Sequence, residues 1–271
     1  MSLVRVCLGL ALLIVSCSVL PAAEPKAVLL IGQGPDGHPP KTHEYMAGQR
    51  ILQHCLKAAP ELKVTLVQAD GDWLEGPELI HRADVVVLFV AEGAKWVQAD
   101  SRRLDALVRL AQRGGGLVSL HWAMGSKEAG PIDAYLKLLG GCHGGPDRRF
   151  QVLTTDLRVA DAGHPITRGV EDLQVRDEFY YRLKFVQPND GLRPVLKADI
   201  DGQAETVAWS WERPEGGRSF GFSGLHFHAN WRRQAYRRTV TQAVMWVAGL
   251  AIPQGGVSVD VPIGDLPGLS N

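Results

Sequence analysis

Short apolar runs alternate with stretches of helical periodicity through the first half of the chain. Four runs rich in Val and Leu predict strands over residues 27–31, 63–68, 84–90 and 116–120. The first has no polar alternation, which is typical of a buried parallel strand. Apolar residues three or four positions apart predict helices between these runs, over 44–59, 100–113 and 132–139, with a short helix or turn over 76–81. The pattern therefore predicts repeated strand–helix units.

Strand patterns dominate the second half of the chain, with few helices between them. They cover residues 150–155, 176–183, 193–200, 206–212 and 219–225, and a closing amphipathic helix is predicted over 234–250. Without crossover helices, we expect these strands to join the sheet in antiparallel fashion. The predicted fold class is α/β: a flavodoxin-like, doubly wound sheet, mostly parallel, with antiparallel additions in the second half. The Gly/Pro-rich stretch 254–271 is predicted to be a flexible C-terminal tail.

Residues 1–23 have the pattern of a secretory signal peptide. Arg5 precedes an apolar stretch over 8–15, which is too short to span a membrane as a helix, and small residues follow. Residues 14–17 also resemble a lipobox, in which Cys17 would carry a lipid after cleavage. We therefore expect an exported protein, periplasmic or extracellular, that contacts a membrane only if Cys17 is lipidated. An uncleaved anchor is a further alternative.

The charge balance argues against a nucleic-acid partner. Lys and Arg total 29, as do Asp and Glu, so the formal net charge is zero, and no basic stripe is visible.

Only Cys55 and Cys142 follow the predicted signal peptide, which allows one bridge at most and excludes a disulfide scaffold. A single domain over residues 26–253 is long enough to bury a large core.

Histidines follow three of the strand-like runs. His43 closes the long Gly/Pro-rich loop after the first run, His121 ends the fourth, and the pair His226 and His228 follows the last. Ligands of open α/β sheets bind beyond the carboxyl ends of the strands, so we expect these side chains to meet in one pocket. On a strand, the imidazoles of His226 and His228 would share one face and chelate one ion. The sequence predicts a site for Zn²⁺ or another divalent metal, with His121, His226 and His228 as ligands. His43 is a further ligand or a catalytic base.

Two acids and a phenol lie close together within the run 176–183. Glu178 and Tyr180 share one face of that strand, whereas Asp177 points to the other. We expect Glu178 to act as a general acid or base, and Asp177 and Tyr180 to bind sugar hydroxyls; solvation of adjacent acids is the alternative. Glu44, at the start of the first helix, is a second candidate for proton transfer. The helix dipole alone would also favour a carboxylate there.

Trp122 and Trp231 lie beside these segments, and their rings can stack on the apolar faces of sugars. The alternative for each is ordinary core packing. His38, in the loop before the first helix, is a weaker candidate for the site. The remaining histidines of the mature chain are expected to have no role there: His54, His81, His143 and His164.

Several short motifs occur in a specific order: His43-Glu44-Tyr45, the run that ends in His121, residues 164–169 leading to Asp177 and Tyr180, and residues 224–228 followed by Trp231. In this order they resemble the trehalose-utilisation (ThuA-like) family, over residues 26–253. That family is similar in fold to the glutamine amidotransferases but lacks their catalytic cysteine, and here His121-Trp122 occupies the corresponding region. The resemblance implies a link to carbohydrate metabolism, including that of oxidised 3-keto sugars.

The preferred function is a metal-assisted enzyme that acts on a sugar or 3-keto-sugar derivative by hydrolysis, elimination or isomerisation, and not a glutamine amidotransferase. The alternative from another class is a non-catalytic carbohydrate-binding module on the same fold. A metal-free hydrolase that uses Glu44 and Glu178 as a pair is a third hypothesis. The expected partner is a small carbohydrate, and the sequence is compatible with a homo-oligomer.

Overall fold

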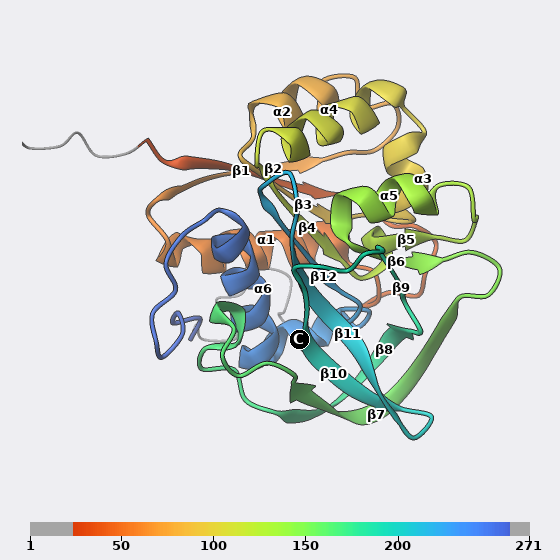
Figure 1. The fold of residues 1–271 in the computed structure, drawn as a ribbon, viewed down its shortest axis with the longest axis vertical. Coiled ribbons are helices and arrows are strands. Elements are labelled where there is room, and N and C mark those ends of the chain that lie inside the picture. The colour runs from red at the N-terminus through yellow and green to blue at the C-terminus, as the bar shows by residue number, and fades with distance from the viewer. Residues whose placement is uncertain (1–23, 261–271) are drawn as a thin grey trace, which may run out of the picture.

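The structure, a computed structural model, describes residues 24–260 (Figure 1). The predicted signal peptide, the lipidation of Cys17 and the part of the predicted tail from residue 261 onward lie outside the described residues. Across 24–260, no helix combines the length and the apolar character that a membrane span requires.

A mixed nine-stranded sheet forms the centre of the fold. Its strands are β1 (Lys26–Gly32), β2 (Leu62–Gln68), β3 (Val85–Phe89), β4 (Gly116–Leu120), β7 (Arg149–Val159), β8 (Leu173–Tyr181), β10 (Leu192–Ile200), β11 (Gln203–Glu212) and β12 (Arg218–Phe222). The strand order is β2-β1-β3-β4-β12-β11-β10-β7-β8. The first five strands in this order are parallel, in the 2-1-3-4-5 arrangement of flavodoxin-like folds. β12 is antiparallel to β11, where the antiparallel half begins, so the predicted fold class is confirmed.

Helices cover both faces of the sheet (Figure 1). One face is covered by α1 (Tyr45–Cys55) and α6 (Gln234–Val247), and the other by α2 (Gly76–Arg82), α3 (Gly93–Gln98), α4 (Ser101–Gln112) and α5 (Ile132–Leu139). Four 3₁₀ turns occur: η1 (Leu56–Ala58), η2 (His121–Met124), η3 (Pro165–Thr167) and η4 (His228–Arg232). A small second sheet contains β5 (Gly125–Ser126), β6 (Gly141–Gly144) and β9 (Lys184–Phe185). The sequence pattern missed α3 and these three strands, because two to six residues are too few to show a period.

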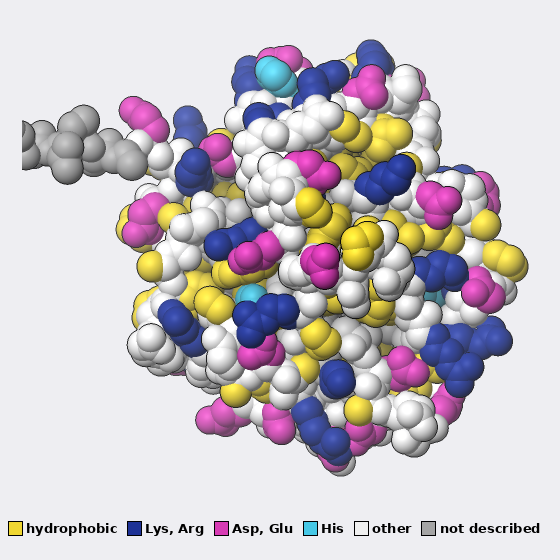
Figure 2. Space-filling model, in the orientation of Figure 1, with side chains coloured by type: hydrophobic (Ala, Val, Ile, Leu, Met, Phe, Trp, Pro, Cys, Tyr) yellow, Lys and Arg dark blue, Asp and Glu magenta, His cyan; other side chains and the backbone are white. Residues whose placement is uncertain are grey.

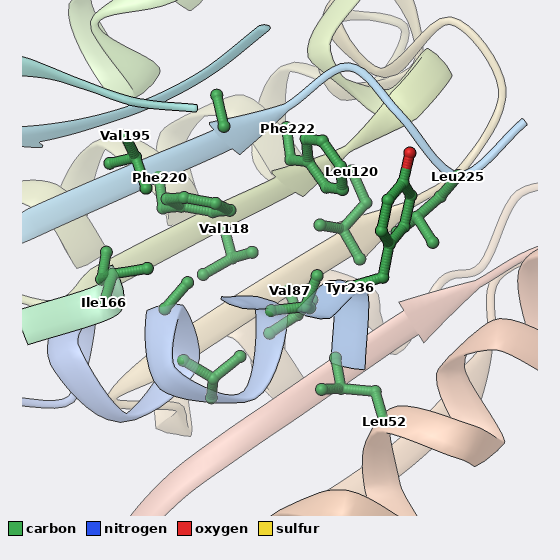
Figure 3. Packing of buried hydrophobic residues seen from close by; sticks show 14 of the residues in the cluster. Leu52, Val87, Val118, Leu120, Ile166, Val195, Phe220, Phe222, Leu225 and Tyr236 are labelled. Atoms are coloured by element: carbon green, nitrogen blue, oxygen red, sulfur yellow. The ribbon is translucent and has the colours of Figure 1, made fainter. Parts of the chain in front are cut away.

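The apolar core lies against both faces of the sheet and takes side chains from its parallel and antiparallel halves. Acidic and basic side chains are interspersed on the surface shown in Figure 2, whereas the interior shown in Figure 3 is made of aliphatic and aromatic side chains. Val87, Val118 and Phe220 come from neighbouring strands and are fully buried against α6. Burial of each such side chain contributes about 1.5–3 kcal/mol.

α1 approaches the sheet closely because Gly48 has no side chain. A Cβ atom at this position would lie 2.6 Å from the ring of Phe89, which is too close for any larger residue. The neighbouring Gln49 is fully buried and donates hydrogen bonds to the carbonyls of Ile31 (2.9 Å) and Val87 (3.1 Å). These contacts fix the start of α1 near the carboxyl ends of β1 and β3.

Residues 254–260 pack against α6, which corrects the predicted start of a flexible tail. Val257 and Val259 are buried. The Val257 amide donates to Oε1 of Gln242 (2.8 Å), and Arg237 donates to the carbonyl of Val259 (3.1 Å). The Gly/Pro content of this stretch obscured its two alternating valines, which bury their side chains as those of an edge strand would.

His164 is buried at the start of η3 and has both ring nitrogens in contact with polar groups. Nδ1 accepts a hydrogen bond from the amide of Ile166 (3.2 Å), and Nε2 lies 3.1 Å from Oγ of Ser210. Burial, together with the nearby charge of Arg193, lowers the pKa of His164 to about 4. The neutral imidazole is therefore the form that the fold accommodates.

We expect the substitution His164→Asn to reduce the pH dependence of stability. An unfolded histidine has a pKa near 6.5, so below that pH the unfolded chain binds more protons than the folded one. The stability due to neutral His164 is fully present above pH 6.5 and is lost as the pH falls towards 4. Asn keeps the capping acceptor without titrating.

The measurement is denaturant unfolding of both proteins at pH 7.5 and 4.5. The free energy of unfolding of the wild type should fall by about 2 kcal/mol more than that of the variant. Equal losses in the two proteins would contradict this role of His164.

Candidate functional site

Three imidazoles meet at the carboxyl edge of the parallel strands. His43 Nε2 lies 2.9 Å from His226 Nδ1 and 3.1 Å from His121 Nε2, and the last two atoms are 3.3 Å apart. Oε1 of Glu178 is 3.8 Å from His121 Nε2 and 3.7 Å from His226 Nδ1. These four potential ligand atoms lie within 4.8 Å of one another. The predicted meeting of His43, His121 and His226 in space is confirmed.

A short antiparallel bridge between two loops brings His43 to His226. Thr42, in the loop after β1, pairs with Phe227, in the loop after β12. The amide of His43 donates to the carbonyl of His226 (3.1 Å), and the amide of His228 donates to that of Lys41 (2.9 Å). Residues 183 positions apart are thus held by main-chain hydrogen bonds, which do not depend on side-chain identity.

The backbone is left-handed where the chain presents these imidazoles. φ is 50° at His43 and 49° at His121, and it is 82° at Leu225, just before His226. This conformation costs an L-residue about 1–2 kcal/mol. Strain of this kind persists only where surrounding contacts enforce it, and it is concentrated at functional sites.

Hydrogen-bond acceptors behind two of the rings fix which nitrogen carries the proton. His121 Nδ1 lies 2.7 Å from the carbonyl oxygen of Ser223, which can only accept. His43 Nδ1 lies 2.9 Å from Oδ2 of Asp36. Both Nδ1 atoms are therefore donors, and both Nε2 atoms direct lone pairs towards the centre of the group. At 3.1 Å these lone pairs repel each other unless a cation lies between them.

Hydrogen bonds among the neutral side chains relieve only part of this repulsion. Tyr180 can donate its hydroxyl to His121 Nε2 (3.1 Å), and an Nδ1 proton on His226 can donate to His43 (2.9 Å). Neither bond places a proton between His43 and His121. The group could therefore hold a positive ion.

Asp36 is held as a carboxylate behind His43. Tyr45 donates to its Oδ2 (2.7 Å), and Nδ1 of His38 lies 2.8 Å from its Oδ1. Burial acts to raise the pKa of Asp36, but the hydrogen bonds from His43, Tyr45 and His38 outweigh it and hold the pKa below its usual value. The ring of His38 also stacks on that of His43, with centroids 3.7 Å apart.

The three central imidazoles are neutral at pH 7. Burial lowers the pKa of His121 well below its usual value and that of His226 to about 4. Burial also lowers the pKa of His43, although Asp36 opposes the shift. Burial, with the charge of Asp177 next to it, raises the pKa of Glu178 to about 7. Neutral imidazole is the form that binds metal ions.

A pocket of about 100 Å³ opens beside this group. His43 and Glu178 line it together with Trp122, Tyr180 and His143. The Tyr180 ring is stacked between His121 (centroids 4.6 Å apart) and His143 (4.0 Å). His143 therefore belongs to the pocket wall, although the sequence predicts no role for it there. It lies on the four-residue strand β6, which is too short to show a pattern.

Three predicted site residues lie elsewhere. Asp177 is fully buried and accepts hydrogen bonds from the Leu225 amide (2.8 Å) and the Tyr236 hydroxyl (3.0 Å). Glu44 accepts from the amide of Lys41 (2.9 Å) and lines a neighbouring cavity. Trp231 is fully buried in the core, which agrees with the alternative of ordinary core packing.

The predicted strand geometry of His226 and His228 is wrong. β12 ends at Phe222, and residue 228 begins the 3₁₀ turn η4. Residues 223–227 lie outside the named strands and Leu225 has a left-handed φ of 82°, so the alternation of a strand does not place the two rings. His226 belongs to the group of close ligand atoms and His228 does not.

A protein-family comparison finds a match to ThuA, described as trehalose utilisation, over residues 30–247. The chain belongs to the ThuA family. No curated protein matches it.

Three solved structures share the fold of this ThuA protein. A ThuA-like protein from Bacteroides uniformis has a TM-score of 0.62 at 14% identity, covering 85% of this chain and 94% of that one. A cytoplasmic protein from Salmonella typhimurium has a TM-score of 0.53 at 14% identity, covering 83% and 97%. A glutamine amidotransferase from Thermotoga maritima has a TM-score of 0.50 at 9% identity, covering 83% and 99%. At these identities the likeness shows the fold alone.

Asp177 is expected to be a structural anchor of this ThuA site. It accepts hydrogen bonds from the Leu225 and Phe227 amides, and so holds the segment that carries His226. The substitution Asp177→Asn would place amide protons against these donors and should lower the free energy of unfolding by about 3 kcal/mol at pH 8.

The matched variant is Tyr236→Phe, which removes only the tyrosine's hydrogen bond to Asp177 (3.0 Å). It should cost about 1 kcal/mol in the same denaturant titration. If the two substitutions cost the same, Asp177 does not anchor the segment.

Proposed function

We propose that this ThuA protein is a metal-assisted enzyme acting on a sugar or a 3-keto-sugar derivative by hydrolysis, elimination or isomerisation. The observation that carries the proposal is the convergence of His43, His121 and His226, with the carboxylate of Glu178 beside them. The description of the family as trehalose utilisation supports a carbohydrate as the substrate. Export, inferred from the first 23 residues, remains part of the proposal.

The spacing of the three nitrogens fits a divalent ion such as Zn²⁺. Nitrogens bound at about 2.0–2.1 Å are about 3.3 Å apart around a tetrahedral ion and about 2.9 Å apart at adjacent octahedral positions. The three separations of 2.9, 3.1 and 3.3 Å lie in this range. The acceptors behind His43 and His121 are the orienting partners that metal-bound histidines commonly have.

A divalent ion held by these residues would supply a Lewis acid for a carbonyl or hydroxyl oxygen of the sugar. Glu178 reaches both the imidazole group and the open pocket, so it can hold or release a proton beside the reacting atom. Trp122 on the pocket wall offers a ring face to the apolar side of a sugar. Burial excludes water from the inner side of the group, because His121 is fully enclosed.

We expect the purified protein to bind about one Zn²⁺ per chain. The substitutions His121→Ala and His226→Ala should weaken binding by more than a hundredfold, because each removes one of the three converging nitrogens. Asp36→Asn should weaken it by about 10–100-fold through loss of the partner that orients His43. Competition with a chromogenic chelator gives each affinity.

His81→Ala is the control, since that exposed histidine lies on α2. His228→Ala tests the originally predicted ligand set and should leave the affinity unchanged. Zinc binding that survived His121→Ala, or that was lost in His228→Ala alone, would disprove the ligand set proposed here.

Turnover should depend on the metal. With a 3-keto-glycoside as substrate, chelator treatment should abolish product formation, and added Zn²⁺ should restore it. Glu178→Gln should lower kcat at least about a hundredfold while zinc binding persists, because Gln cannot transfer a proton. Product is followed by chromatography.

Two results would support the other hypotheses instead. Binding of the sugar without turnover in the zinc-loaded protein would favour a carbohydrate-binding module. Full activity in the presence of chelator would favour a metal-free hydrolase.

A further inference from the structure

Two basic residues contribute to the pocket that Glu178 and Tyr180 line. Arg148 and Lys127 are both among the pocket's lining residues. Arg148 directly precedes β7, and Figure 2 shows Lys and Arg side chains gathered on the surface where β7 begins in Figure 1. Glu178 is the one acid among the lining residues.

The positive charge of Arg148 is not neutralised within residues 24–260. Its guanidinium donates to the carbonyl of Gly145 (3.4 Å) and forms no ion pair among the described residues. The neighbouring Lys184 differs, because it is paired with Asp147 (2.8 Å). Half-buried and unpaired, the Arg148 guanidinium retains most of its capacity to bind an anion.

Lys127 is only loosely paired. Its Nζ lies 3.8 Å from Oε1 of Glu92, and the lysine side chain is 59% exposed. Such a surface pair contributes little energy, so Lys127 can turn towards a ligand at low cost. Tyr180 and His143, which form the wall below, carry no charge at neutral pH because burial opposes their charged forms.

These observations rest on the proposed function and extend it to the class of substrate. We infer that the sugar carries an anionic group, which Arg148 binds at the mouth of the pocket with Lys127 beside it. The planar guanidinium fork matches the paired oxygens of a carboxylate or a phosphate. With a divalent ion on the imidazoles, the ion, Arg148 and Lys127 together carry more positive charge than the one carboxylate of Glu178 can neutralise. A neutral sugar would leave Arg148 and Lys127 without a partner of opposite charge in the pocket.

The experiment compares three probes by calorimetric titration: D-glucose, D-glucuronate and D-glucose 6-phosphate. On the wild-type protein at low ionic strength, one of the two acids should bind at least tenfold more tightly than glucose. The acid that does so identifies the group as a carboxylate or a phosphate. Arg148→Gln should bring the affinities for acid and glucose within about twofold of each other.

Arg149→Gln is the matched control. Arg149 is the next residue, is exposed, and is not among the pocket's lining residues. It should keep the wild-type preference. Equal affinity for glucose and both acids, binding of none of them, or a preference unchanged in Arg148→Gln would each overturn the inference.

Zinc content is measured on the same samples, with titrations repeated on zinc-free protein. If the protein binds no zinc when zinc is supplied but prefers an acid in a way that depends on Arg148, the anion site is supported and only the metal proposal fails. If the protein binds one zinc ion per chain but shows no preference for an acid, the inference of an anion site is wrong and the metal proposal stands.

Discussion

The whole site depends on the orientation of two imidazoles by acceptors behind them. The Ser223 carbonyl oxygen accepts a hydrogen bond from Nδ1 of His121 (N to O, 2.7 Å), and the Asp36 carboxylate accepts one from Nδ1 of His43 (2.9 Å). This leaves the Nε2 lone pairs of His121 and His43 facing each other at 3.1 Å in a buried space. Two facing lone pairs repel each other in the protein alone, whereas a cation between them would attract both. The group is therefore suited to act as a set of metal ligands.

The fold supports this arrangement through main-chain contacts. Flavodoxin-like strand order brings β1, β4 and β12 into one parallel group, so the loops that follow them emerge at the same edge. The Thr42–Phe227 bridge joins two of these loops, and Asp177 holds the second from below. His43 and His121 adopt left-handed conformations where the His43 amide is bonded to the His226 carbonyl and the His121 ring to the Ser223 carbonyl, and contacts of this kind hold a strained backbone in place.

Much of the fold was predictable from the sequence, because the period of the apolar residues carries the information. The buried runs gave β1, β3 and β4 to within a residue or two, and the rule for the carboxyl edge of parallel strands predicted that His43, His121 and His226 would meet. Elements such as β6 were not predictable, since four residues show no period.

The part of the site that was missed depends on tertiary contacts. Asp36 lies in a loop without a motif, and its role follows only from its hydrogen bonds with His43 and Tyr45. Strand alternation predicts that His226 and His228 share a face, but β12 ends at Phe222 and Leu225 adopts a left-handed φ of 82°. Asp177 was expected at the pocket, but the chain uses it to satisfy buried amides.

The most direct measurement is anomalous diffraction at the zinc edge from crystals of the full protein grown with Zn²⁺. The imidazole geometry predicts one strong peak enclosed by Nε2 of His43, Nε2 of His121 and Nδ1 of His226. An absence of density there, or a peak bound through other residues, would contradict the central claim.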